Sequence, residues 1–330
     1  MSWMQKITEL KEKVLHGGDI SFEEAFELIG LEDGKAIHHL INSAHEITLH
    51  FNSNQPGLCS LINAKSYLCG EDCAFCAQSV RFDTGADRYD LLDPEVILAA
   101  AKKAQAKGAK NFCIVTSGAA PLPDEFDKLL PIIKRLVKET SLNIDASLGF
   151  VTKEQAEKLS EAGLRRFNHN VQTSREFYPN IVSTHSYDTR LNTLRALLEG
   201  GLELCSGGIL GMGESREDRV KMAFELKRFQ PHCVPVNLLN PRPGTPLEKA
   251  PPMDPLEAVK TIAVFRFVLP HANIKLAGGR EGALREYQEL ALRGGANGLI
   301  MGGYLTTQGN PIAADFAMLE RIGYEVKHSH

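Results

Sequence analysis

The feature that most constrains this chain is a group of three cysteines, Cys69, Cys73 and Cys76, spaced Cys-x3-Cys-x2-Cys. A loop can fold thiols at this spacing around one metal centre. Three thiolates are one short of the four ligands usual in a structural zinc site or a complete iron–sulfur cluster. One iron of a four-iron cluster held here would therefore be open to a substrate or cofactor. The alternative is a zinc site completed by a distant histidine.

Length and charge exclude several classes of protein. The chain has 330 residues, enough for one large domain or two small ones, and a hydrophobic share of 43% can build a sizeable core. A net charge of −4 with scattered lysine and arginine offers no basic surface, so we expect no nucleic-acid partner. No apolar run approaches the roughly 18–20 residues of a membrane span. We therefore expect no membrane association.

The cysteine content indicates the compartment. Seven cysteines, an odd number that includes a tight triplet, do not resemble the disulfide framework of a secreted protein. Residues 1–13 also lack the apolar stretch of a signal peptide. We therefore expect a cytoplasmic protein, because a reducing compartment preserves thiolates and air-sensitive clusters.

The first part of the chain is predicted to be helical. Apolar side chains recur at helical spacing over residues 3–14 and again over residues 37–47. Between them, Ser21 with Glu24 forms a capping box for a second helix. These stripes are typical of packing surfaces, so we assign residues 1–52 to an N-terminal helical extension.

From about residue 57 the pattern changes to strands that alternate with capped helices. Thr152 with Gln155 caps one helix, and Asp93 and Asp254 each precede a proline at the first helical position. Eight such strands over roughly 250 residues favour a (β/α)8 barrel of the TIM type. An open doubly wound sheet is the runner-up, but the Gly-x-Gly-x-x-Gly fingerprint that would favour it is absent. The expected strands cover residues 58–64, 111–117, 142–148, 166–171, 203–210, 233–239, 274–277 and 298–301.

The barrel is expected over residues 53–310, and residues 311–330 are expected to form a C-terminal helix and tail packed on it. Active sites of such barrels lie at the C-terminal ends of the strands. The three cysteines follow the first expected strand directly. We therefore expect their metal centre at the mouth of the barrel.

Several expected strands carry polar or thiol side chains where a core strand would be aliphatic. A lone buried cysteine usually packs as a small hydrophobe, but a buried aspartate or arginine must be paired or liganded. Together these residues predict a polar chamber that holds a second metal centre and a small polar substrate. They are Cys113, Asp145, Asn168, His169, Asn170, Cys205, Asn237 and, after the seventh strand, Arg280.

The cysteine spacing resembles the signature of the radical S-adenosylmethionine (SAM) enzymes. The resemblance implies a [4Fe-4S] cluster on Cys69, Cys73 and Cys76, whose open iron is chelated by the amino and carboxylate groups of SAM. One electron then splits SAM into methionine and a 5′-deoxyadenosyl radical. Phe75 also fits, since an aromatic residue before the last cysteine lies beside the adenine in that family.

Further stretches resemble the biotin synthases, from about residue 60 to the C-terminus. The resemblance implies sulfur insertion into dethiobiotin, with sulfur from a second, auxiliary cluster deep in the barrel. In most members that cluster is a [2Fe-2S] centre held by three cysteines and one arginine. Cys113 and Cys205 match two of the cysteines and Arg280 matches the arginine, but Asp145 stands at the position of the third cysteine. The stretches are NHN at 168–170, YPNI at 178–181, SYDTRLNT at 186–193, CSGGI at 205–209, PVN at 235–237, GTPL at 244–247, GRE at 279–281 and YLTT at 304–307.

The departure at Asp145 leaves two interpretations open. The carboxylate is an oxygen ligand of the cluster, although it is harder than a thiolate, or it is a group next to a cluster that is built differently. A larger cluster with an extra sulfide would need fewer protein ligands per iron. Cys59 and Cys233 have no assigned role; Cys59 could point inward from the first strand, whereas Cys233 is expected to pack in the core.

The same resemblance implies roles for other side chains. Arg190 would pair with the SAM carboxylate, and Gln172 stands where many members have a carboxylate that also contacts SAM. Amides at Asn170 and Asn237 would hydrogen-bond the ureido ring of dethiobiotin. The expected SAM-binding residues are Phe75, Asn170, Gln172, Arg190 and Ile209. The expected substrate-binding residues are Asn168, Asn170, Asn237, Thr306 and Thr307, of which Asn168 and the threonines would contact the valeryl carboxylate.

The resemblance thus implies a biotin-synthase-like enzyme that uses a flavodoxin or ferredoxin as electron donor and forms a homodimer. One rival is another radical SAM barrel, such as a hydrogenase-cofactor maturase or an amino-acid mutase. Cys113, Cys205 and Arg280 argue against it, because such relatives need no sulfur-donating cluster there. The rival of a different class is a non-catalytic metal-binding protein.

Overall fold

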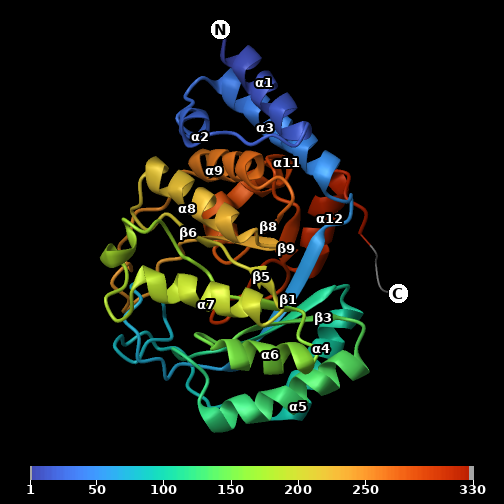
Figure 1. Cartoon of the computed structure of the whole chain (residues 1–330), viewed down its shortest axis with the longest axis vertical. Coiled ribbons are helices and arrows are strands. Elements are labelled where there is room, and N and C mark those ends of the chain that lie inside the picture. The colour runs from blue at the N-terminus through green and yellow to red at the C-terminus, as the bar shows by residue number, and fades with distance from the viewer. Residues whose placement is uncertain (1, 327–330) are drawn as a thin grey trace.

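A computed structural model describes residues 2–326 and shows a parallel barrel surrounded by helices (Figure 1). Strands pair in the order β1 to β5, and β7 to β9 close the ring on β1. β5 and β6 are two pieces of one strand, because both pair with β7. The ring therefore has eight parallel positions, which confirms the predicted (β/α)8 barrel. The strands are β1 (Gly57–Lys65), β2 (Asn111–Thr116), β3 (Asn143–Ser147), β4 (Arg166–Asn168), β5 (Glu203–Cys205), β6 (Gly208–Leu210), β7 (Cys233–Leu238), β8 (Asn273–Leu276) and β9 (Gly298–Ile300).

The break between β5 and β6 falls where the strand carries two adjacent glycines. A Cβ on Gly207 would lie 2.0 Å from the carbonyl oxygen of Pro235, and one on Gly208 would lie 2.4 Å from that of Gln172. Only glycine allows so close an approach of neighbouring backbones. The chain therefore leaves the regular ladder here, beside the cavity described below.

The helices begin where their capping residues predict. Ser21 with Glu24 and Thr152 with Gln155 form capping boxes, and α4 and α9 begin at the prolines that follow Asp93 and Asp254. The helices are α1 (Trp3–Leu15), α2 (Phe22–Ile29), α3 (Gly34–Phe51), α4 (Pro94–Ala106), α5 (Pro123–Glu139), α6 (Lys153–Glu161), α7 (Tyr187–Glu199), α8 (Arg216–Phe229), α9 (Pro255–Val268), α10 (Arg280–Leu284), α11 (Gln288–Arg293) and α12 (Ile312–Arg321), with short 3-10 turns η1 (Tyr178–Asn180) and η2 (Arg285–Tyr287).

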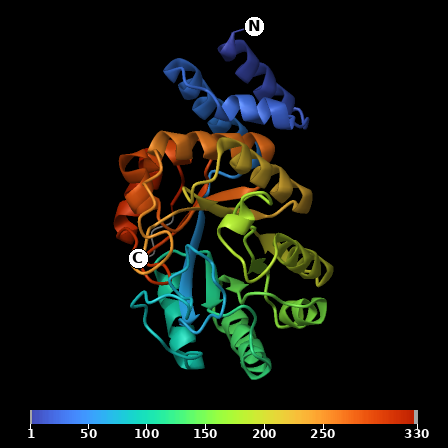
Figure 2. The same cartoon turned by 90° about the vertical axis from the view of Figure 1, so that its left-hand side faces the viewer.

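The three N-terminal helices stand outside the barrel, against its helical layer (Figure 2). α2 and α3 pack on α9, with further contacts to α8 and α11. The buried ammonium of Lys260 on α9 donates to the Leu31 carbonyl at 2.8 Å, between α2 and α3. Trp3, the first residue of the expected apolar stripe, is 42% exposed, whereas Val14 at its end is buried.

The loops that lead into β8 and β9 are held together by Arg266 of α9, which is fully buried. Its guanidinium donates to the carbonyls of Pro270 and Ala272 at 2.8 Å and to that of Gly295 at 2.8–2.9 Å. These carbonyls replace the water that the cation loses on burial. No helix within residues 2–326 is long and apolar enough to cross a membrane.

Candidate active site

One cavity runs from the mouth of the barrel into its interior. The loop after β1, the strand ends around the barrel and the loop after β9 all contribute to its lining. It collects nearly every residue that the sequence singled out. Those on the lining are Cys59, Cys69, Cys73, Phe75, Cys76, Cys113, Asp145, Asn168, His169, Asn170, Gln172, Arg190, Cys205, Ile209, Asn237, Thr306 and Thr307.

The cysteine loop leaves β1 through two residues in the left-handed region, Tyr67 (φ 63°) and Leu68 (φ 61°). Non-glycine residues there cost on the order of 1–3 kcal/mol each and persist only where the surroundings enforce them. Gln78 supplies that enforcement, since its Oε1 accepts from the Tyr67 amide at 2.8 Å and its carbonyl accepts from the Cys69 amide at 3.3 Å. The turn directs Cys69 over the mouth of the barrel.

Burial disfavours the thiolate forms of Cys73 and Cys76. Burial raises the pKa of Cys73 to about 12 and raises that of Cys76, although the Arg190 cation opposes both shifts. A metal centre must therefore displace protons as it binds. Within residues 2–326, no group of three His, Cys, Asp or Glu side chains lies close enough to hold a single ion. A four-iron cluster binds each of its cysteine thiolates at a different iron, so it requires no such group.

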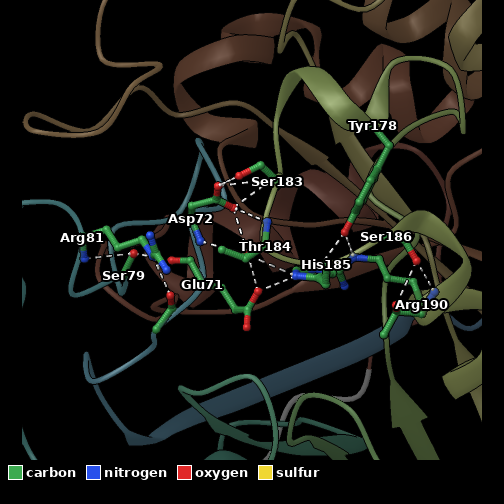
Figure 3. A network of polar contacts seen from close by, with 12 residues as sticks. Glu71, Asp72, Ser79, Arg81, Tyr178, Ser183, Thr184, His185, Ser186 and Arg190 are labelled. Atoms are coloured by element: carbon green, nitrogen blue, oxygen red, sulfur yellow. Dashed lines mark hydrogen bonds and ion pairs between the residues drawn. The ribbon is translucent and has the colours of Figure 1, made fainter.

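Two acidic residues inside the cysteine motif tie the loop to the segment before α7 (Figure 3). The Asp72 carboxylate accepts from the backbone amides of Ser183 at 3.0 Å and Thr184 at 3.2 Å. Burial opposes its ionisation, but a hydrogen bond from the Ser183 hydroxyl, together with those from the two amides and the Thr184 hydroxyl, holds the pKa of Asp72 below its ordinary value. Glu71 accepts from the Thr184 hydroxyl and contacts His185.

A chain of hydrogen bonds continues from Glu71 to Arg190 (Figure 3). His185 Nδ1 lies 2.5 Å from the Glu71 carboxylate and its Nε2 lies 2.7 Å from the Tyr178 hydroxyl. Burial and the Arg190 cation lower the pKa of His185. A neutral ring that donates from Nδ1 accepts the Tyr178 proton at Nε2, which leaves the phenol oxygen to accept from Arg190 Nε at 2.5 Å.

Arg190 lines the cavity, acts electrostatically on Cys73 and Cys76, and is 8% exposed. Among residues 2–326 its hydrogen bonds go to two neutral acceptors, the Tyr178 hydroxyl and the Asn170 carbonyl at 3.1 Å. A guanidinium with only neutral partners is poorly compensated and suits a carboxylate ligand. This geometry fits the role that the sequence predicts for Arg190, and the role stays a prediction.

Gln172 has an unusual backbone and an unused side chain. It adopts a left-handed conformation (φ 74°), in which its amide donates to the Gly207 carbonyl at 3.1 Å. Its side-chain oxygen is buried without a hydrogen-bond partner within residues 2–326. A buried orphan acceptor on a cavity wall indicates a place for a ligand donor.

The predicted amides keep hydrogen-bonding capacity for a ligand. Asn237 Oδ1 accepts from the Gly278 amide at 3.1 Å and its Nδ2 donates to the Gly208 carbonyl at 3.2 Å. Asn170 Oδ1 accepts from the Gly207 amide at 3.1 Å. An amide has two donor hydrogens and two acceptor lone pairs, so each of these side chains is fixed by the barrel yet retains capacity toward the cavity.

The deep part of the cavity is lined by thiols and two opposite charges. Cys59, Cys113 and Cys205 lie here on different strands, together with Asp145 of β3 and Lys275 of β8. All five are less than 9% exposed. Cys233 pairs in register with Cys205 but does not line the cavity.

Charges in this chamber are incompletely balanced. Burial raises the pKa of Asp145 to about 6, against the opposing Arg166 and Lys275. One Asp145 oxygen lies 3.7 Å from Arg166, and the other, Oδ1, has no hydrogen-bond partner among the described residues. Burial alone would lower the pKa of Lys275, but the surrounding thiols and Asp145 outweigh it and raise that pKa. A chamber with a buried carboxylate and a buried ammonium can bind a ligand that interacts with both groups.

The structure does not bring Arg280 to this chamber. Arg280 opens α10 after a turn at Gly279 and is fully buried beside Asp315, whose Oδ2 accepts from it at 2.7 Å. The cation that faces the thiols is instead Lys275, which the sequence analysis missed. A lysine in the short apolar run of β8 was the available signal, since a buried lysine requires a partner.

Family models and solved structures show the class of enzyme to which this chain belongs. The family model described as "Radical SAM superfamily" matches residues 65–226, and the one described as "Biotin and Thiamin Synthesis associated domain" matches residues 235–325. The crystal structure of methylornithine synthase has the same fold at a TM-score of 0.83, with 22% identity over 97% of this chain and 98% of that one. The [FeFe]-hydrogenase maturase HydG gives the same TM-score at 19% identity over 98% of this chain and 76% of that one. The chain is a radical SAM barrel enzyme.

Curated relatives narrow the class. The biotin synthase of Heliobacterium modesticaldum is 44% identical over 98% of this chain and 100% of its own length. That of Pelotomaculum thermopropionicum is 46% identical over 96% of this chain and 99% of its own. This chain belongs to the biotin synthase family, which confirms the family predicted from the sequence and sets aside both rivals.

Proposed function

We propose that this chain converts dethiobiotin to biotin by radical sulfur insertion, with its two reaction centres at the two ends of the cavity. The observation that carries the proposal is the continuity of that cavity, from the three-cysteine loop at the mouth to Cys59, Cys113 and Cys205 inside. Identities of 44–46% over nearly the whole of both chains support the same reaction.

The outer end is proposed to hold the [4Fe-4S] cluster and SAM. Cys69, Cys73 and Cys76 supply three thiolates, and Arg190 pairs with the carboxylate of SAM. When bound, the two cofactors supply the 5′-deoxyadenosyl radical that removes hydrogen from the substrate, and the inner cluster supplies sulfide. Phe75, Asn170, Gln172 and Ile209 complete the SAM site; the orphan oxygen of Gln172 offers an acceptor there.

Dethiobiotin is proposed to lie between the two ends. Asn170 and Asn237 offer donors and acceptors to the ureido ring, since each keeps hydrogen-bonding capacity beyond its barrel contacts. Asn168, Thr306 and Thr307 are proposed to bind the valeryl carboxylate. The barrel wall excludes water from the reacting carbons and holds the substrate at a fixed distance from both centres, which is where proximity lowers the barrier.

For the inner cluster we propose Cys59, Cys113 and Cys205 as thiolate ligands, with Lys275 in place of the arginine assigned from the sequence. Cys59 thereby supplies the thiolate that is missing at position 145. Asp145 is then a hydrogen-bond acceptor beside the cluster, paired with Arg166. Both assignments depart from the positions of the common ligand set, and we propose that the cluster is a larger, sulfide-bearing one and not an ordinary [2Fe-2S] centre. Burial raises the pKa of Cys59 to about 11 and is opposed by Lys275, which therefore assists thiolate formation.

Organisation and partners follow the family. We propose an N-terminal helical extension over residues 1–52, a catalytic barrel over 53–310, and a C-terminal segment over 311–330, of which residues 327–330 lie outside the described structure. We also propose a flavodoxin or ferredoxin as the one-electron donor, a homodimer, and a cytoplasmic location.

The test is anaerobic reconstitution followed by product analysis. Protein loaded with iron and sulfide, given dithionite, SAM and dethiobiotin, is expected to form biotin and 5′-deoxyadenosine. Iron and sulfide counting with Mössbauer spectroscopy is expected to show two cluster species. About four irons and a single species, together with SAM cleavage but no biotin, would contradict sulfur donation from an inner cluster.

A further inference from the structure

Arg280 forms a buried ion pair that barrel packing alone does not explain. Arg280 Nη2 lies 2.7 Å from Asp315 of α12, and both side chains are fully buried. A buried ion pair contributes little net stability compared with apolar residues of similar volume, because both ions lose their hydration. The pair therefore calls for a role in fixing a particular geometry.

The other hydrogen bonds of Arg280 go to the start of the loop after β9. Its Nε donates to the Tyr304 hydroxyl at 3.2 Å, and its Nη2 donates to the Ile300 carbonyl at 3.4 Å. Its Nη1 donates to Gln288 of α11. The guanidinium thus links α11, α12 and the end of β9 to Tyr304, near the start of this loop.

Glu281 holds the far side of the same loop. Its Oε1 accepts from the Tyr304 hydroxyl at 2.9 Å and from the Asn310 amide at 3.3 Å. The Asn310 side chain in turn donates to Asp315 at 3.3 Å. We name Arg280, Glu281, Tyr304, Asn310 and Asp315 the brace.

The two ends of the loop touch within the brace. A Cβ on Gly309 would lie 1.9 Å from the Gly302 carbonyl oxygen, so only glycine permits this approach. Residues 302–309 therefore form a closed loop whose ends are fixed, as in a compact Ω-type loop. The tip is held separately, because the Tyr304 amide donates to the Thr307 carbonyl at 2.8 Å and Asn63 of β1 donates to the Leu305 carbonyl at 3.4 Å.

The brace ends at the cavity. Tyr304 and its neighbours Leu305, Thr306 and Thr307 all line it, whereas Arg280 does not. We infer that Arg280 is a positioning residue, which through Tyr304 and Asp315 sets the place of the Thr306 and Thr307 hydroxyls and so controls recognition of the dethiobiotin carboxylate. This inference rests on the proposed function, which assigns that carboxylate to the two threonines.

The positions of the two threonine hydroxyls matter because neutral hydrogen-bond donors bind a carboxylate weakly. A hydroxyl recognises a carboxylate only with correct distance and angle, and it has no net charge to compensate for misplacement. Displacement of the loop by about 1 Å is expected to cost roughly 10- to 100-fold in substrate affinity. Cluster content and SAM binding should not change, because within residues 2–326 the hydrogen bonds and ion pairs of the brace join it to neither group of cysteines.

The experiment compares Tyr304→Phe, Asp315→Asn and Arg280→Lys in reconstituted full-length enzyme. Each variant removes or weakens brace contacts with little change in volume. The expected result is a KM for dethiobiotin raised about 10- to 100-fold, with iron content, sulfide content and the Kd of SAM at wild-type values. Arg321→Met, at an exposed ion pair on the same helix α12, is the matched control.

A substrate analogue separates positioning from general destabilisation. Wild-type enzyme is expected to prefer dethiobiotin to the analogue with a primary alcohol in place of the carboxylate. Thr306→Ala and the brace variants should both reduce this preference, and Arg280→Lys should retain more of it than Arg280→Met. If Arg280→Met does not fold, Tyr304→Phe and Asp315→Asn provide the same comparison.

Three results would overturn the inference. Loss of the inner-cluster iron in Arg280→Lys would make Arg280 part of the cluster site. Unchanged KM and unchanged preference in Tyr304→Phe and Asp315→Asn, with Thr306→Ala impaired, would show that the brace does not position the loop. Unchanged preference in Thr306→Ala and Thr307→Ala would instead contradict the carboxylate assignment itself, and with it the foundation of this inference.

Discussion

Lys275 places a positive charge among the thiols of the inner chamber, and its replacement should show whether the cluster depends on it. Lys275→Met removes the cation that lines the chamber with the thiols and leaves Asp145 with Arg166 as its neighbouring cation. Removing one partner from a buried charged group costs on the order of 3–5 kcal/mol. We expect loss of the inner-cluster iron and of biotin formation, with the SAM cluster retained, measured by iron counting and Mössbauer spectroscopy. Lys65→Met, at a buried lysine paired with Glu125, should keep both clusters.

Replacement of Asp145 tests whether its carboxylate is a ligand of the inner cluster. Cys59 also lines the chamber and is proposed to supply a thiolate ligand, so the cluster does not need the Asp145 carboxylate. We therefore expect Asp145→Asn to keep the iron and sulfide content and to shift the reduction potential of the inner cluster. The measurement is a redox titration followed by electron paramagnetic resonance. A drop in iron content would instead make the Asp145 carboxylate a direct ligand.

Arg190 is the residue whose neutral surroundings favour an anionic ligand. Arg190→Met should weaken SAM binding by on the order of 2–5 kcal/mol, the cost of truncating one partner of a buried charged pair. Equilibrium binding to the reconstituted enzyme measures it, and cluster content should not change. Arg195→Met on the same helix α7 is the control, because Arg195 is exposed and contacts Asn192 and the Phe229 ring on the surface of the protein, away from the cavity lining. Equal SAM affinity in wild type and Arg190→Met would contradict the assignment.

At the scale of elements, the cysteine loop depends on contacts far away in sequence. Its strained entry at Tyr67 is held by Gln78, and its centre is held by Asp72 against the segment before α7. Contacts within the protein therefore hold both the entry and the centre of this loop. This preorganisation explains how three thiols can present a consistent site at the barrel mouth.

Removing a cysteine from this loop should stop SAM cleavage, whereas removing one from the chamber should stop only sulfur insertion. Cys73→Ala is expected to abolish formation of 5′-deoxyadenosine, because the cluster loses one of three protein ligands. Cys113→Ala is expected to keep 5′-deoxyadenosine formation and lose biotin. Chromatographic assay of both products, after anaerobic reconstitution, measures the difference. Wild-type 5′-deoxyadenosine yield from Cys73→Ala would remove this loop from the mechanism.

At the scale of the whole molecule, one buried lysine anchors the N-terminal helices to the barrel. Lys260 donates to the Leu31 carbonyl and pairs with Glu257 at 2.5 Å. Lys260→Met leaves that carbonyl unsatisfied, which should destabilise the protein by about 1–3 kcal/mol. Thermal unfolding measures the loss, and the exposed Lys35→Met serves as the control. Because Lys260 is not on the cavity lining, cluster content should not change; an unchanged midpoint would contradict the anchoring role.

Much of the site was accessible from the sequence because it consists of side chains at strand ends. Once the strands are placed, a barrel brings their C-terminal ends together, so Asn170, Cys205 and Asn237 were expected to meet and they do line one cavity. The network from Glu71 through His185 and Tyr178 to Arg190 was not expected. It joins segments more than a hundred residues apart through side chains that have no distinctive spacing.

The sequence by itself determined the order and type of the elements, because capping boxes, prolines and apolar periodicity act within a few residues. It also determined the three-cysteine loop, whose chemistry depends only on local spacing. Only the tertiary structure decided which cation faces the thiols. β8 ends at Leu276, and the chain turns at Gly279, where a Cβ would lie 1.9 Å from the Leu238 carbonyl oxygen. Strand alternation therefore stops before Arg280, which turns toward Asp315, while Lys275, still within the strand, points into the chamber.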